Sequence, residues 1–306
     1  MTNLSRLLAL SLSLPVAACA VDPGATSPDP SAPARVHREG GVAFDLTTGV
    51  VSADSPAPTM PAIGTVTTPE VLPPDASAQP DEIMGADGRT QVSPTTAYPA
   101  RARVRIVVEF SDGYEADASG HMVGNKYVIT AGHVVYSADH GGWATELFAF
   151  PGENGSSKPY AAMGVNFRTT EGWVDDQDDD VDYALVTLDS AVGNQTGWFG
   201  LATFSDDFFD NNPDVELAGY PADKPFGTQW GEAGPIVDNS DDCLFYNIDS
   251  AGGDSGAGIA LDFNGSHVVT GVHHGTGYYW LSYYNQATRI TNARLNQIVG
   301  WIQSGT

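Results

Sequence analysis

The sequence predicts an all-β fold, a barrel or a sandwich, followed by one amphipathic helix. Short runs rich in β-branched and aromatic residues recur from about residue 100 onward, as expected for strands. Clusters of Gly, Asn, Asp and Ser separate these runs, as turns separate the strands of barrels and sandwiches. Near the end of the printed sequence, the apolar residues change to a helical spacing.

The first twenty residues have the features of a signal peptide. Arg6 supplies a short basic region, and residues 7–14 form an apolar run that is too short to span a bilayer. Residues 16–19 resemble a bacterial lipobox, which would attach a lipid anchor to Cys19, but residues 18–20 also fit an ordinary cleavage site. We therefore expect a secreted protein, either free or tethered to the cell surface as a lipoprotein precursor.

Residues 21–82 differ in composition from the rest of the chain. They contain 11 of the 20 prolines, much Ala, Ser and Thr, and few aromatic residues. Such a stretch buries too little apolar surface to offset its ordering entropy, so we expect it to be largely flexible. A linker, a stalk or a propeptide would share this composition.

The predicted strands and helix follow this Pro-rich segment. In chain order, the strands are 103–110, 126–130, 183–188, 215–219, 243–248 and 267–272. Apolar residues at 295, 298, 299 and 302 predict an amphipathic helix over residues 292–303. A hydrophobic fraction of 42% with 6 Trp is sufficient for a buried core.

The charge balance excludes several partners. The chain has 13 Lys and Arg against 38 Asp and Glu, for a formal net charge of −25. Binding to phosphate requires clustered basic residues, so we expect no nucleic acid partner. No segment after the signal peptide is long and apolar enough for a membrane span. The acidic run 175–180 could bind calcium, but it lacks the spacing of a known calcium loop and is better interpreted as a solvated acidic loop. We expect neither a metal nor a cofactor.

The segment Gly252-Gly253-Asp254-Ser255-Gly256 has the composition that a nucleophilic serine requires. Such a serine lies on a tight turn, with backbone N–H groups directed at the oxyanion that develops during acyl transfer. Glycines allow both the turn and the close approach of a substrate carbonyl. The segment predicts Ser255 as nucleophile and the N–H groups of Gly253 and Ser255 as the oxyanion hole, although similar strings occur in plain turns.

Two further motifs supply the partners of such a serine. His133 ends the string Thr-Ala-Gly-His, which follows an apolar strand and places a general base at a strand end. Asp182 directly precedes the apolar run 183–186, where an acid can orient the imidazole and stabilise its cation. Because His133, Asp182 and Ser255 occur in this order with long gaps, we predict that they form a catalytic triad.

Together, these motifs resemble the chymotrypsin superfamily, and within it the chain is similar to the bacterial glutamyl endopeptidases. The similar stretches, which span about residues 83–306, are 85–90 (GADGRT), 95–99 (TTAYP), 219–221 (GYP), 227–230 (GTQW) and 288–291 (TRIT). The resemblance implies a chymotrypsin-like double β-barrel with a C-terminal α-helix and the active site between two six-stranded barrels. It also implies a monomer that acts on protein or peptide substrates.

The same resemblance implies an inactive precursor. Mature members of the family begin close to the stretch that matches residues 83–87, and the residue before this stretch is Glu82. We therefore expect residues 21–82 to be a propeptide and residues 83–306 to be the catalytic domain. An acid-specific protease could cut its own precursor after Glu82.

The resemblance also suggests which residues hold the substrate side chain before the scissile bond, the P1 residue. Family members that prefer Glu use a histidine and hydroxyl groups, and His273 and Ser250 match these positions. A desolvated carboxylate requires such donors or a positive charge. His274 is the alternative to His273, and only one of them can face the pocket because neighbours on a strand point to opposite sides.

Asp249 leaves a second specificity open. It lies six residues before Ser255, where trypsin-like enzymes place the acid that binds Arg or Lys, although some glutamyl endopeptidases also carry Asp there. If the enzyme prefers Glu, Asp249 must point away, be protonated or be paired. Asp254 is unusual for this group, and the amino group of Ile83 released by maturation could pair with it or line the pocket.

The expected function is therefore that of a secreted serine endopeptidase that works through an acyl-enzyme and cleaves after Glu or Asp. One alternative is the same fold and chemistry with a preference for Arg or Lys. The other is a non-catalytic binding module on this fold, because a fold does not fix function.

Overall fold

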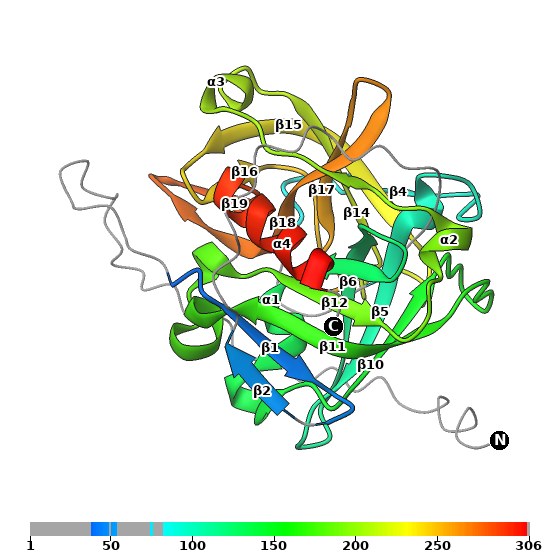
Figure 1. The fold of residues 1–306 in the computed structure, drawn as a ribbon. Coiled ribbons are helices and arrows are strands. Elements are labelled where there is room, and N and C mark those ends of the chain that lie inside the picture. Colours follow the sequence, from blue (N-terminus) through cyan, green and yellow to red (C-terminus); the bar gives the residue numbers. More distant parts are fainter. Residues whose placement is uncertain (1–37, 49, 54–73, 76–81, 305–306) are drawn as a thin grey trace.

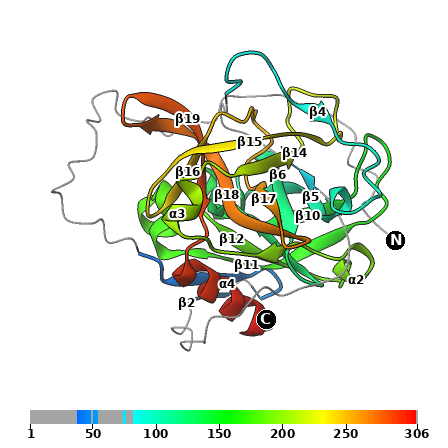
Figure 2. The same ribbon diagram turned by 90° about the horizontal axis from the view of Figure 1, so that it is seen from above.

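The structure, a computed structural model, describes residues 38–48, 50–53, 74–75 and 82–304. The predicted signal peptide with Cys19, and most of the predicted propeptide, lie outside the described residues. Two β-barrels lie side by side, and helix α4 (Asn292–Ser304) packs against the first of them (Figures 1 and 2). None of the helices in the described ranges is long and apolar enough to cross a membrane.

The first barrel is a ring of six antiparallel strands. It closes because β10 pairs with both β5 and β11. In ring order, its strands are β5 (Arg103–Glu109), β6 (Glu115–Met122), β7 (Tyr127–Thr130), β12 (Ala184–Leu188), β11 (Ala162–Thr170) and β10 (Glu146–Pro151).

The second barrel repeats this arrangement with the later half of the chain. It closes because β18 pairs with both β17 and β19. In ring order, its strands are β14 (Asp214–Gly219), β15 (Trp230–Asn239), β16 (Cys243–Tyr246), β19 (Ser282–Arg289), β18 (Ser266–Tyr279) and β17 (Gly258–Phe263).

Short elements connect or flank the two rings. The strands in this group are β1 (Gly41–Asp45), β2 (Val50–Ala53), β3 (Pro74–Asp75), β4 (Thr90–Gln91), β8 (Tyr136–Ser137), β9 (Gly142–Trp143) and β13 (Gly200–Leu201). The helical turns are η1 (Ala100–Ala102), α1 (Gly132–Val135), η2 (Ala138–His140), the π-helical η3 (Gly172–Asp176), η4 (Asp179–Val181), α2 (Gly193–Thr196) and α3 (Asp206–Phe209).

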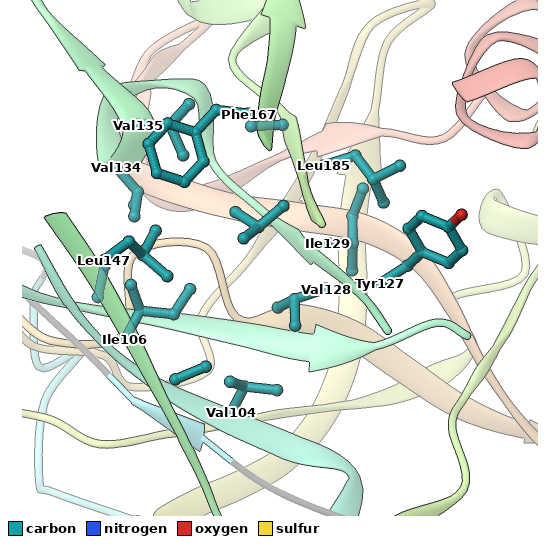
Figure 3. Packing of buried hydrophobic residues seen from close by; sticks show 14 of the residues in the cluster. Val104, Ile106, Tyr127, Val128, Ile129, Val134, Val135, Leu147, Phe167 and Leu185 are labelled. Atoms are coloured by element: carbon teal, nitrogen blue, oxygen red, sulfur yellow. The ribbon is translucent and has the colours of Figure 1, made fainter. Parts of the chain in front are cut away.

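The interior of the first barrel is a continuous apolar core. Val104 and Ile106 on β5 and Val128 and Ile129 on β7 are completely buried and belong to this cluster (Figure 3). Trp301 of α4 belongs to the same cluster, so the helix seals one side of the barrel. Removing a large apolar side chain from such a core typically costs about 2–5 kcal/mol.

The prediction of an all-β double barrel with a C-terminal helix is confirmed. Each of the six predicted strand segments overlaps a strand, and the predicted helix 292–303 corresponds to α4. Other barrel strands, including β6 and β15, were not predicted. The sequence of β6 contains no β-branched residue, and β15 contains two Gly and a Pro. Pairing with neighbours, more than intrinsic propensity, forms these strands.

One part of the Pro-rich segment also pairs with the first barrel. Strands β1 and β2 form a hairpin, and β1 runs antiparallel to β11 from Gly41 opposite Thr170 to Asp45 opposite Asn166. The hairpin lies along the lower side of the molecule in Figure 1. The composition of this segment predicts a flexible chain. It does not reveal the pairing, because the partner strand lies more than a hundred residues away in the sequence.

Candidate active site

His133 lies on α1, a single helical turn that directly follows β7. Its neighbour Gly132 packs so tightly that a Cβ atom there would lie 2.7 Å from Thr169 Oγ1 and 2.9 Å from Asp182 Oδ1. A glycine is therefore required before the histidine, because a side chain would displace Asp182. The ring centroids of His133 and Trp173 lie 6.0 Å apart, and the two rings meet edge to face.

Asp182 contacts His133 twice. Its Oδ2 lies 2.7 Å from His133 Nδ1, and its Oδ1 accepts the backbone N–H of His133 at 2.9 Å. The Asp182 side chain is almost fully buried, whereas that of His133 is 20% exposed. Burial alone would raise the pKa of Asp182, but the charge and hydrogen bonds of His133 outweigh burial and hold the pKa below its ordinary value. The pair thus joins a buried anion to an imidazole that substrate can reach.

Ser255 lies on the turn before β17, and a residue of the first barrel holds this turn in place. The backbone N–H of Ser119, on β6, donates to the Ser255 carbonyl at 2.6 Å. The Ser119 hydroxyl donates to the Gly253 carbonyl at 3.3 Å, and Thr130 Oγ1 donates to the Ser119 carbonyl at 2.5 Å. Ser119 therefore joins the predicted nucleophile to the strand that leads into His133. It was not predicted, because the sequence of β6 gave no strand signal.

The backbone at Gly253 has a conformation that favours glycine. Its φ is +123°, and a Cβ atom there would lie 2.5 Å from the Tyr220 carbonyl oxygen. In the described structure, the backbone N–H groups of Gly253 and Ser255 donate to no protein acceptor. The hydroxyl of Ser255 is buried and likewise has no hydrogen-bond partner among these residues. These three donors are thus unused by the described part of the protein.

Ser250 and His273 are both completely buried in the second barrel. The Ser250 hydroxyl has no hydrogen-bond partner within the described ranges. His273 Nδ1 lies 2.7 Å from the Tyr246 hydroxyl and 2.9 Å from the Gln286 carbonyl oxygen. The Tyr246 hydroxyl also donates to that carbonyl, at 3.0 Å. Tyr246 and Gln286 had no local sequence signal and come from strands β16 and β19.

His274 interacts with different groups from His273. It is partly buried, and its electrostatic partners include Asp182 and Asp180, on the side of the His133–Asp182 pair. Burial lowers the pKa of His274 to about 4, although the charge of Asp182 opposes this shift. The adjacent histidines are thus distinguished: His273 contacts Tyr246, and His274 lies where the two barrels meet.

Asp249 is turned toward the segment that follows Glu82. Its Oδ1 accepts the backbone N–H of Met84 at 2.6 Å, and its Oδ2 accepts that of Gly88 at 2.7 Å. The residue is only 3% exposed. Asp249 is therefore paired with backbone donors, which is one of the three arrangements compatible with a preference for Glu. A carboxylate with two such backbone donors is well satisfied inside the protein.

Asp254 has a cationic neighbour that sequence reasoning missed. Arg89 Nη1 lies 3.9 Å from Asp254 Oδ2, and the Arg89 side chain is 1% exposed. The same guanidinium contacts Asp87 at 3.1 Å and Asp223 at 2.5 Å. The pairing of Asp254 with the amino group of Ile83 remains a prediction, since the structure is that of the uncut chain.

The acidic run 175–180 is part of a surface loop. The side chains of Asp175 and Asp176 are 51% and 57% exposed, and Arg38 lies 2.6 and 3.6 Å from them. In the part of the chain that the structure describes, no three His, Cys, Asp or Glu side chains are grouped so that they could hold a metal ion.

Comparison with known proteins identifies relatives of this chain. A model of the trypsin family matches residues 91–295. The chain is 35% identical over 229 residues to a Bacillus subtilis protein named extracellular metalloprotease, with 73% of this chain and 70% of the relative covered. It is 34% identical over 227 residues to the glutamyl endopeptidase of Bacillus licheniformis, with 72% and 69% covered.

Solved structures share the fold. One, described as a Glu endopeptidase in complex with MPD, superposes with a TM-score of 0.63 at 23% identity and covers 73% of this chain and 100% of its own. The protease Anisep from Arthrobacter nicotinovorans superposes with a TM-score of 0.52 at 16% identity and covers 70% of this chain and 93% of its own. At these identities, the likeness concerns the double barrel itself.

Proposed function

This chain belongs to the trypsin family and is a serine endopeptidase, and we propose that it cleaves peptide bonds on the carboxyl side of glutamate. The observation that carries the proposal is the pairing of Asp249. Both of its oxygens accept backbone N–H groups of residues 84 and 88, so it does not stand free to bind an Arg or Lys side chain. The buried polar groups that remain nearby, Ser250 and His273, suit a carboxylate.

The proposed chemistry is acyl transfer. Ser255 attacks the substrate carbonyl, and His133 takes the serine proton and later gives a proton to the leaving amine. Asp182 holds His133 through Nδ1, which leaves Nε2 for Ser255, and it stabilises the imidazolium that forms. The N–H groups of Gly253 and Ser255 stabilise the oxyanion. Among residues that the structure describes, these two N–H groups have no protein acceptor, which supports this role.

His273 recognises the P1 carboxylate in its protonated form. The Gln286 carbonyl can only accept, and it receives the Tyr246 proton, so Nδ1 of His273 must be the donor to Tyr246 or Gln286. The remaining ring nitrogen, Nε2, is then an acceptor in the neutral ring. A proton taken up with the substrate turns Nε2 into a donor and adds the positive charge that a buried carboxylate requires. Ser250 supplies a further donor through its hydroxyl.

Maturation by cleavage after Glu82 belongs to the same proposal. In the uncut chain, the Glu82 carbonyl accepts from Asn285 Nδ2 at 2.9 Å and from the Ser250 N–H at 3.4 Å. These donors differ from the N–H groups of Gly253 and Ser255 that would hold a scissile carbonyl. The bond after Glu82 must therefore move away from these donors before it is cut.

The proposal extends to localisation and partners. The N-terminal signal and the name of the extracellular relative from Bacillus subtilis support secretion, and the substrates are proteins or peptides. We propose that the enzyme acts as a monomer. A lipid anchor on Cys19 would make the full-length protein partition into detergent, and replacement of Cys19 by Ala would abolish that partitioning.

The deciding experiment is cleavage of a peptide set that varies only at P1. The matured protein is compared with Ser255→Ala as the inactive control and with Asp249→Asn as the test of the rival specificity. We expect cleavage after Glu by the wild type, none by Ser255→Ala, and an unchanged P1 preference in Asp249→Asn. Cleavage after Arg or Lys that Asp249→Asn abolishes would show that Asp249 controls the pocket and would overturn the proposal.

A further inference from the structure

The hairpin β1–β2 occupies an edge that the first barrel leaves open. On one side of β11, strand β10 pairs only with Ala162 and Met163. Strand β1 pairs on the same sheet with residues 166–170 of β11, which would otherwise present unpaired N–H and C=O groups. The hairpin therefore completes the strand that leads into the loop carrying Asp182.

The chain before β1 holds the start of that loop. The N–H of Glu171 donates to the Gly40 carbonyl at 2.5 Å, and the N–H of Gly172 donates to the Arg38 carbonyl at 2.8 Å. The Arg38 side chain adds ion pairs to Glu171 at 3.2 Å and to Asp175 at 2.6 Å. Because Arg38 is 47% exposed, we expect these pairs to contribute little compared with the backbone bonds.

The same segment also contacts helix α4. Glu39 Oε1 lies 2.9 Å from Nε of Arg294, whose side chain is 1% exposed, and the Glu39 carbonyl accepts from the Gln297 amide. The Gln297 oxygen in turn accepts from the hydroxyl of Tyr183, the residue after Asp182. A continuous set of contacts thus runs from the hairpin segment to the neighbour of the proposed catalytic acid.

Aromatic packing anchors the hairpin itself. Phe44 on β1 stacks on Trp143, with ring centroids 5.4 Å apart and an interplanar angle of 15°. It also lies 6.5 Å from the Phe167 ring, which is part of the barrel core. Such pairs contribute about 0.5–1.5 kcal/mol beyond the area they bury.

We propose that residues 38–53 stay bound to the enzyme after maturation and serve as a strand of the mature molecule. The surface formed by β11, the start of the 171–182 loop and α4 is their docking site, and their bound presence keeps Asp182 in place. The inference rests on the proposed cut after Glu82 only in that a cut converts the hairpin into a separate fragment. Removal of the covalent link lowers the effective concentration of the hairpin, but all the contacts above can persist.

The binding test uses the full chain carrying Ser255→Ala, with residues 76–81 replaced by the recognition site of an unrelated, site-specific protease. This cut does not depend on the enzyme's own specificity. After cleavage, native mass spectrometry and size-exclusion chromatography at micromolar concentration should find the hairpin fragment bound to the barrels. Phe44→Ala should release it, whereas Val51→Ser, at a position that is 55% exposed on β2, should not. A wild-type fragment that separates from folded barrels would overturn the proposal.

The functional test uses the same cleavable chain with Ser255 intact. Its substrate is whichever peptide the P1 set shows to be cleaved, so a failure of the glutamate proposal leaves this test valid. Release of the fragment in Phe44→Ala should lower kcat by at least about tenfold, because small displacements of catalytic groups are costly, and should leave KM nearly unchanged. The uncut Phe44→Ala chain provides the control for a direct effect of the substitution. An unchanged kcat after release would show that the loop does not depend on the hairpin.

Discussion

The two barrels contribute to the candidate site in different ways. The first barrel supplies His133 and Asp182, which contact each other directly at 2.7 Å within short loops at the ends of neighbouring strands. The second supplies Ser255, Ser250 and His273, and the surroundings of His273 come from Tyr246 on β16 and from Gln286 on β19, the strand that pairs with β18. In the proposed mechanism, the acid–base pair is local to one barrel, whereas Ser255 comes from the turn before β17 in the second barrel and the selectivity groups there form a distributed network.

This difference leads to a testable separation of effects. Substitutions in the pair of the first barrel should lower turnover for every substrate. Substitutions in the network of the second barrel should change the choice between substrates, because they alter binding of one side chain. Substitutions where the barrels meet should affect stability more than they affect turnover or substrate choice.

The largest effect is expected from Asp182→Asn. An amide cannot stabilise the imidazolium and favours the wrong tautomer of His133, so kcat should fall by about 10⁴-fold with the P1 preference unchanged. Steady-state kinetics on two substrates of different P1 would measure both quantities. Asp176→Asn, in the same loop but 57% exposed, is the matched control and should retain full activity. A selective loss for one substrate would contradict the proposed division between the barrels.

An intermediate effect is expected from His273→Gln. Loss of a hydrogen bond to a charged group costs about 1.5–3 kcal/mol, so kcat/KM for a Glu substrate should fall by roughly 10- to 150-fold. The ratio of Glu to Gln cleavage should fall with it, while kcat/KM for the Gln substrate changes little.

The control for this variant lies on the same strand. His267→Gln changes a histidine of β18 that is 27% exposed and pairs with Asp262, and it should leave the Glu to Gln ratio intact. If both variants lowered kcat on all substrates equally, His273 would be part of the catalytic machinery and the comparison between barrels would fail.

The smallest effect is expected from His274, where the barrels meet. Its pKa in the folded protein is about 4, below the unfolded value of about 6.5, so the unfolded chain binds more protons between these pH values. The free energy of unfolding should therefore decrease as pH falls from about 6.5 to about 4. Urea titrations at several pH values would show a weaker decrease in His274→Gln. An identical pH dependence in both proteins would show that His274 does not contribute.

Much of the fold was predictable because strands rich in β-branched residues can be recognised from their composition. Strands β5, β7 and β12 were predicted for this reason, and the helical spacing of residues 295–302 predicted α4. Strand β6 was not predictable, although its Ser119 joins the two barrels, because Glu, Asp, Ser and Gly in its sequence are poor strand formers. Only its neighbours in the ring make it a strand.

The sequence by itself determined the all-β class and indicated the three residues proposed as the triad. The backbone next to the proposed catalytic groups is so closely packed that only glycine fits at Gly132 and Gly253. These glycines form short motifs with the neighbouring residues, and such motifs can be recognised in the sequence. The tertiary structure alone decided that Asp249 pairs with residues 84 and 88, that His273 rather than His274 contacts Tyr246, and that β1 pairs with β11. Each of these outcomes depends on partners far away in sequence, and a buried polar group or an open strand edge is satisfied by whatever the fold brings to it.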